Sequence, residues 1–230
     1  MKKLLKKLLS LIFIALIVFC AYFAVTGYLM YKNATKDITV SEKVKEIRRQ
    51  ENYIVLDNIP DIYENAVIFA EDSRFYSHKG VDLISLARAT FKNIKDKELS
   101  QGGSTITQQL AKNMFFTNEK SFSRKAAELF VVYELEDRYS KDVILELYIN
   151  TVYYGGGNYG ILDASKGFFQ CLPEDLTEYE ATYLAGLPNA PSLFYENKEL
   201  AKKRHEVVLN AMVKCDVLTD DEKEEILDNE

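Results

Sequence analysis

The stretch from Leu8 to Tyr31 holds no charged residue, and this run restricts how the first part of the chain can fold. About 20 apolar residues, each rising about 1.5 Å in a helix, match the hydrocarbon thickness of a bilayer. Residues 1–7 carry lysines and no acid. Because positive flanks stay in the cytoplasm, we predict a single-pass helix in the cell membrane over 8–31, with residues 1–7 cytoplasmic and the rest extracellular or periplasmic.

A cleaved signal peptide is the alternative for this run. Signal peptides have a shorter apolar core and a small-residue cleavage site, and neither feature is present here. Cys20 also raises the idea of a lipidated cysteine, but the bulky Phe19 before it argues against that processing. We therefore favour a retained anchor.

Composition excludes several classes of protein. The chain has 230 residues, 47% hydrophobic and 28% charged, which suits one globular domain. A net charge of −6 argues against sequence-independent binding to nucleic acid. Cys20, Cys171 and Cys215 form no CxxC pair, and whether Cys171 and Cys215 form a disulfide stays open. The two histidines are too few for a His-rich zinc site.

Helical periodicity dominates the remainder, so we expect a mainly α domain over 59–214. It follows a polar stalk, 32–58, in which SEKVKEIRRQEN indicates a short solvated helix, and it precedes an acidic tail, 215–230. Thr151–Gly160 combines aromatic residues with glycines and predicts a loop or small hairpin. The amphipathic patterns cover 62–70, 83–94 after an N-cap at Asp82, Ser104–Met114, Ser123–Tyr139, Ser140–Asn150, Thr177–Leu187 and Lys198–Lys214.

The first cluster of chemically useful residues is EDSRFYSHKG, Glu71–Gly80, at the end of an apolar helical pattern. A carboxylate beside an apolar wall tends to have a raised pKa, which suits it to accept a proton from a hydroxyl group. Glu71 and Asp72 are equally compatible with the solvated end of a helix, since most carboxylates lie at the surface. Locally, both interpretations stay open.

The second cluster is QGGSTITQQLAKN, Gln101–Asn113. Glycines before a hydroxyl-capped helix start present free backbone N–H groups, which suit phosphate. Thr105, Gln109 and Lys112 are spaced to share one helix face, so they predict a polar row along an anionic substrate. A capped surface helix would show the same pattern.

The third cluster contains Arg124, Lys125 and Glu128. Arg124 and Glu128 lie one helical turn apart, where a surface ion pair contributes a few tenths of a kcal/mol. Alternatively, Arg124 and Lys125 neutralise a diphosphate while Glu128 holds them or binds a metal ion.

In this order and spacing, the clusters resemble the peptidoglycan glycosyltransferases, or transglycosylases, which occur as monofunctional enzymes and in bifunctional penicillin-binding proteins. The resemblance covers about Ile59–Met212 and rests on EDSRFYSHKG, GGSTITQQLAKN, RKAAE with SKDVILELYIN, YYGGGNYGI and LTEYEATYLAGLPNAPS. It implies a lysozyme-like, mainly α fold of two lobes around a groove near the membrane. It also implies inverting transfer that polymerises lipid II into β-1,4-linked glycan and releases undecaprenyl diphosphate.

The resemblance further implies roles for individual residues. Glu71 would take the proton of the acceptor hydroxyl, and Glu128 matches the second essential carboxylate. The positions that match contacts to the donor are Thr105, Gln109, Lys112 and Arg124. The positions that would support them are Asp72, Phe75, His78, Gly102, Gly103, Ser104 and Lys125.

The partners implied are lipid II, the growing lipid-linked glycan, the cytoplasmic membrane and other cell-wall synthesis proteins, without nucleic acid. No cofactor is required, and a divalent cation (Mg²⁺ or Mn²⁺) near Glu128 stays open. No SxxK motif follows, so we expect glycan polymerisation without cross-linking. The rival interpretations are a lysozyme-like glycan-cleaving enzyme and an inactive wall-synthesis scaffold, which would have little use for a matched set of acids and bases.

Overall fold

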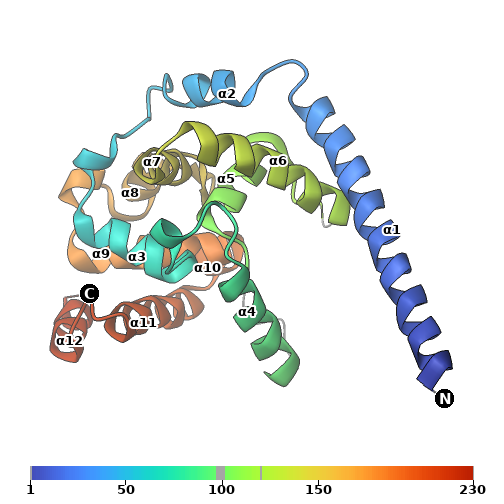
Figure 1. Cartoon of the computed structure of the whole chain (residues 1–230). Helices are drawn as coiled ribbons and strands as arrows, with labels where there is room; N and C mark the ends of the chain where they lie inside the picture. The colour runs from blue at the N-terminus through green and yellow to red at the C-terminus, as the bar shows by residue number, and fades with distance from the viewer. Residues whose placement is uncertain (1, 97–101, 120, 230) are drawn as a thin grey trace.

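The computed structural model describes residues 2–96, 102–119 and 121–229, and it confirms a mainly α architecture (Figure 1). Gln101, the first residue of the second cluster, lies outside the described residues. The α-helices are α1 (Lys2–Ala34), α2 (Val40–Ile47), α3 (Asp61–Glu71), α4 (Leu83–Asp96), α5 (Ile106–Phe115), α6 (Phe122–Arg138), α7 (Lys141–Thr151), α8 (Ile161–Phe169), α9 (Glu178–Gly186), α10 (Pro191–Glu196), α11 (Lys198–Lys214) and α12 (Asp220–Asp228).

A two-stranded antiparallel sheet interrupts the helices, as the glycine cluster predicted. Strand β1 (Tyr153–Gly155) pairs with β2 (Asn158–Tyr159). Gly160, which follows the hairpin, has a φ of +80°, and a Cβ there would lie 2.8 Å from the carbonyl oxygen of Asn150. Both facts require glycine at this position. Short 3₁₀ turns occur at Leu56–Asn58, Phe75–Ser77, Pro173–Asp175 and Leu187–Asn189.

Most helices begin where a small polar side chain satisfies a free backbone N–H group. The side chains that cap helices in this way are Thr39, Thr105, Ser121, Ser140, Thr177, Asn197 and Thr219. Asp82 accepts hydrogen bonds from the N–H groups of Ile84 and Ser85 and confirms the predicted start of α4. Local sequence therefore determines where these elements begin.

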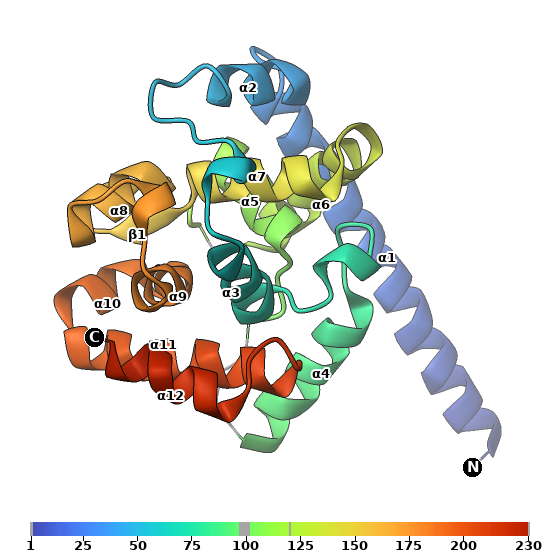
Figure 2. The same ribbon diagram turned by 90° about the vertical axis from the view of Figure 1, so that its left-hand side faces the viewer.

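The helices pack in two groups. Helices α3, α9 and α11 pack on one another, whereas α5 packs on both α6 and α7 (Figure 2). Large aromatic side chains are buried beside the first group: Tyr63 of α3 and Tyr154 of β1 are fully buried, and their hydroxyls form a hydrogen bond. This packing leaves α3, α5, α6 and α11 around a common space.

The segment predicted to be a solvated stalk is part of the domain core. Val40, Val44 and Ile47 of α2 are 1%, 2% and 3% exposed. The segment after α2 is also bound to α7, because the Glu146 carboxylate accepts hydrogen bonds from the Arg48 guanidinium and the Leu56 N–H. The stalk prediction was wrong because it weighed charge and overlooked the i, i+4, i+7 spacing of these apolar residues.

The residues predicted to form an acidic tail also fold onto the domain. Helix α12 buries Ile226, which is 2% exposed, and packs on α9 and α11. Three of its acids, Asp220, Asp221 and Glu222, lie in the first turn, where negative charge interacts favourably with the positive end of the helix dipole. Cys171 and Cys215, whose pairing the sequence left open, are both free thiols.

Helix α1 contains the predicted membrane span. In the described part of the chain it is the one helix long and apolar enough to cross a bilayer, with a mean hydropathy of 2.8 over its most apolar window. Most of its length projects from the domain, and its second half packs on α6 (Figure 1).

Candidate active site

A cavity of about 770 Å³ lies between the two groups of helices. Side chains of α3 and α11 border it on one side, and those of α4, α5 and α6 on the other. The predicted site residues that line it are Glu71, Asp72, Gly102, Gly103, Ser104, Thr105, Gln109, Lys112, Arg124 and Lys125. Clusters that are separate in the sequence thus meet at one cavity.

Glu71 is the last residue of α3, and its side chain is only 8% exposed. Its Oε2 accepts a hydrogen bond of 2.8 Å from Gln109 Nε2, and its Oε1 pairs with Arg204 Nη2 at 3.1 Å. Burial raises the pKa of this carboxyl group, while Arg204 and Gln109 oppose the rise. Glu71 therefore combines a raised proton affinity with a fixed orientation, as a general base requires.

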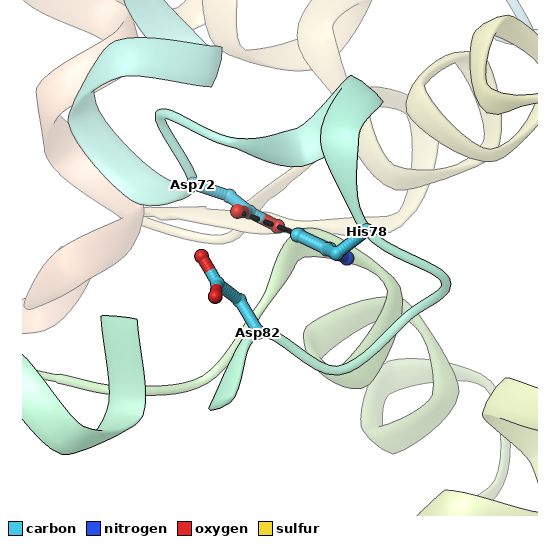
Figure 3. Close-up of side chains that lie close together, drawn as sticks. All are labelled: Asp72, His78 and Asp82. Carbon is cyan, nitrogen blue, oxygen red and sulfur yellow. Dashed lines mark hydrogen bonds and ion pairs between the residues drawn. The ribbon is translucent and has the colours of Figure 1, made fainter. Parts of the chain in front are cut away.

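Asp72, the next residue, has partners other than those of Glu71 and holds the loop that follows α3. Both of its carboxylate oxygens lie within hydrogen-bonding distance of His78 Nε2, at 2.9 and 3.0 Å (Figure 3). Asp82 lies beside this pair, so that the three side chains gather between α3 and α4 (Figure 3). Asp82 is already engaged by Arg74 and by the start of α4. Through these contacts, the three side chains hold the loop between α3 and α4 in place.

Phe75 belongs to the same loop and is fully buried. The Lys141 ammonium lies 4.4 Å from the centre of its ring, a cation–π contact. Neither Phe75 nor His78 lines the cavity. Their positions fit the supporting roles that the sequence predicts for them.

The start of α5 differs in one respect from the predicted phosphate site. Thr105 caps the helix, is 3% exposed and donates a hydrogen bond of 2.6 Å to the carbonyl oxygen of Gly80. The N–H group of Ile106, which has no partner within the helix, donates a hydrogen bond of 3.1 Å to Asp72 Oδ2. The anion at this helix end is thus a side chain of the protein, and the Thr105 hydroxyl is engaged by Gly80 at the wall of the cavity.

Helix α6 brings three charged side chains together. Glu128 is fully buried, and its carboxylate forms ion pairs with the Arg124 guanidinium and, at 2.9 Å, with Lys125 Nζ. Lys125 Nζ also donates to Ser104 Oγ at 3.1 Å. Glu128 does not line the cavity, so its carboxylate acts here by holding the two cations that do.

The far wall of the cavity is strongly cationic. Burial and the nearby Arg124 lower the pKa of Lys112. Burial, Arg124 and Lys112 together lower the pKa of Lys125 to about 8. Three cations that repel one another beside a single buried carboxylate are suited to a multiply charged anion such as a diphosphate. Both oxygens of the Glu128 carboxylate, near which the sequence left a divalent cation open, form ion pairs with cations of the protein.

Arg204 is a site residue that the sequence analysis missed, as it also missed Arg88 and Lys92 of α4, which line the cavity. It extends from α11, is 16% exposed and reaches Glu71. In the sequence it belongs to the basic run Lys202–Arg204. Its position on the apolar stripe between Ala201 and Val208 is the signal that could have found it, because a charge on a buried helix face needs a partner.

Comparison with known proteins agrees with this geometry. The family model described as Transglycosylase matches residues 37–213, which include α2 as well as the domain predicted from residue 59. Penicillin-binding protein 1A of Neisseria gonorrhoeae is 42% identical over 187 residues, covering 80% of this chain and 23% of that protein. Penicillin-binding protein 4 of Bacillus subtilis is 40% identical over 187 residues, covering 80% and 30%. The chain spans less than a third of the length of these curated relatives. It belongs to the Transglycosylase family.

Proposed function

We propose that this chain is a peptidoglycan glycosyltransferase that polymerises lipid II into β-1,4-linked glycan. The observation that carries the proposal is the position of Glu71, a buried carboxylate at a cavity whose opposite wall holds Lys112, Arg124 and Lys125. A base toward a hydroxyl and a cationic site for a phosphate are the two groups that sugar transfer from a lipid diphosphate needs.

In the reaction, the 4-hydroxyl oxygen of the acceptor sugar attacks the anomeric carbon of the donor. Glu71 takes the hydroxyl proton, and the bond between the anomeric carbon and the diphosphate oxygen breaks. The bonding electrons leave with undecaprenyl diphosphate, and the configuration at carbon inverts. Lys112, Arg124 and Lys125 offset the charge that develops on the leaving group.

Neighbouring residues prepare these groups before substrate arrives. Gln109 and Arg204 fix the Glu71 carboxylate, and Glu128 fixes Arg124 and Lys125. Orientation of this kind lowers the barrier because reacting groups need not be ordered during the reaction. The chain's own cations suffice for the diphosphate, so we propose a reaction without an obligatory metal ion.

The location follows from the substrate. We propose that α1 crosses the cytoplasmic membrane with its lysines inside, so that the cavity faces the extracellular or periplasmic side. Lipid II, the growing glycan and other cell-wall synthesis proteins meet the domain there.

Two incubations test the function. The full chain in lipid vesicles is given lipid II, with and without a chelator, and in parallel preformed glycan. We expect chain growth from lipid II that the chelator does not abolish, and no shortening of the glycan. Shortening without chain growth would identify a glycan-cleaving enzyme, and no reaction with either substrate would favour a scaffold.

A further inference from the structure

The second half of α1 is docked on α6 along a specific interface (Figure 1). Thr26 Oγ1 and Ser123 Oγ lie 3.0 Å apart and share a hydrogen bond. The ring of Phe23 lies 5.3 Å from that of Phe122, and the ring of Tyr31 lies 5.5 Å from that of Phe130. A flexible tether would need none of these contacts.

Gly27 sets how closely the two helices approach. It is the buried residue of α1, and a Cβ built on it would lie 2.5 Å from Ala126 Cβ and 2.9 Å from the Ala126 carbonyl carbon. Small residues at such a crossing let helix backbones come into contact, as in membrane helix pairs. Because backbone atoms of α6 lie next to Gly27, a larger side chain at this position must push α1 and α6 apart.

The same stretch of α6 carries the cations of the cavity. Ser123 and Ala126 face α1, while Arg124 and Lys125, next to them in the sequence, line the cavity. A change in how α1 meets α6 therefore changes where these cations lie relative to the membrane.

The length of α1 indicates the depth at which α6 is held. The uncharged run begins at Leu8, and Phe23 is roughly 22 Å further along a helix that rises about 1.5 Å per residue. That lies inside a hydrocarbon layer about 30 Å thick. Phe122, in contact with Phe23, is thus held in the outer third of the layer. Ser123, which meets Thr26 roughly 27 Å along α1, lies close to the outer edge of the layer, and Arg124 is the next residue of α6.

We propose that α1 is a rigid spacer and that Gly27 is a positioning residue, which sets Arg124 and Lys125 at the height of a diphosphate carried by a membrane lipid. This inference rests on the proposed function. It gives α1 a role in capturing the substrate, in addition to attaching the domain to the membrane.

The test compares Gly27→Leu with Ala24→Leu, which adds the same side chain at an exposed position of α1. Each full-length variant, in vesicles, is given long-chain lipid II and, separately, a water-soluble short-chain analogue. For Gly27→Leu we expect kcat/KM to fall roughly tenfold or more with the membrane substrate and by less than about twofold with the soluble one. Ala24→Leu should match the wild type with both.

Equal losses with both substrates would overturn the proposal, because they would indicate damage to the site itself. Wild-type activity of Gly27→Leu with both substrates would overturn it too. A wild-type chain inactive on both would instead overturn the proposed function. If Gly27→Leu does not fold, judged by circular dichroism, then Gly27→Ala, with one added carbon, must show the same selective loss in smaller degree. If Gly27→Ala shows no selective loss, the proposal that α1 is a rigid spacer is refuted.

Discussion

At the scale of single residues, we propose that Glu71 carries the chemistry. Glu71→Gln keeps the shape of the side chain and removes the base, so we expect polymerisation to fall roughly 10²- to 10⁴-fold while the melting temperature changes little. Glu64→Gln is a matched control on the same helix: burial raises the Glu64 pKa to about 7, but Glu64 does not line the cavity. The measurement is the rate of lipid II polymerisation by both variants. Near-normal activity of Glu71→Gln would show that Glu71 is not the base.

The pH dependence follows from two groups. Glu71 must be ionised, and since burial raises its pKa, activity should fall on acidification at a higher pH than an exposed glutamate would give. Lys125 must be protonated, and with a pKa of about 8 it loses its charge as the pH rises through that value. A bell-shaped kcat/KM profile is expected. Lys125→Arg, which stays charged, should move the alkaline limb to higher pH. An unchanged limb would exclude Lys125 as its cause.

Arg204 tunes the base. Its positive charge opposes the rise in the Glu71 pKa, so Arg204→Met should raise that pKa further and shift the acid limb of the profile to higher pH. Lys203→Met removes an exposed charge from the same helix and serves as the control. An acid limb that stays in place in Arg204→Met would mean that the ion pair is absent from the working enzyme.

Local motifs predicted the residues of the site but not all of their roles. Glu71, Lys112 and Arg124 were recognisable because acid, base and spacing lie within short segments. For Glu128, the helical spacing predicted contacts with Arg124 and Lys125 and the resemblance implied a second essential carboxylate; its two ion pairs match the contacts predicted from the spacing. Arg204 lies 133 residues from its partner, a separation that no local pattern spans.

At the scale of elements, the start of α5 determines where Gln109 and Lys112 lie. Thr105 both caps this helix and bonds to Gly80, so Thr105→Ala should destabilise the domain by about 1 to 3 kcal/mol. Thr105→Ser keeps the hydroxyl and should recover most of the loss. Urea unfolding in detergent measures both. Equal stability of the alanine and serine variants would mean that the hydroxyl contributes nothing.

Helix boundaries were largely predictable from caps, whereas partners were not. The capping residues Ser121, Ser140 and Thr177 stand in the sequence directly before their helices. Whether a polar helix such as α2 is solvated depends on what covers its apolar stripe, and that cover comes from α7, far along the chain. Helical periodicity indicates that one face of a helix is apolar, but it does not indicate which other element buries that face.

At the scale of the whole molecule, α1 carries the candidate membrane span and contacts the domain without belonging to the core of either group of helices. The described core begins at Val40, and of α1 only Tyr31 packs against it. The domain should therefore fold without α1, but Ala126 and Phe130 of α6 would then lose their cover and extend the apolar surface of Phe122, which is already 68% exposed.

A chain lacking residues 1–34 tests this division. We expect its far-UV circular dichroism to show a folded helical domain, and size-exclusion chromatography to show association in buffer that detergent reverses, because an exposed apolar stripe promotes association. Adding Phe122→Ser and Phe130→Ser should restore a monomer without detergent, since the stripe is then broken. Loss of the helical signal would show that α1 is needed for folding. A monomer in plain buffer without the serine substitutions would show that the uncovered face of α6 is too small to drive association.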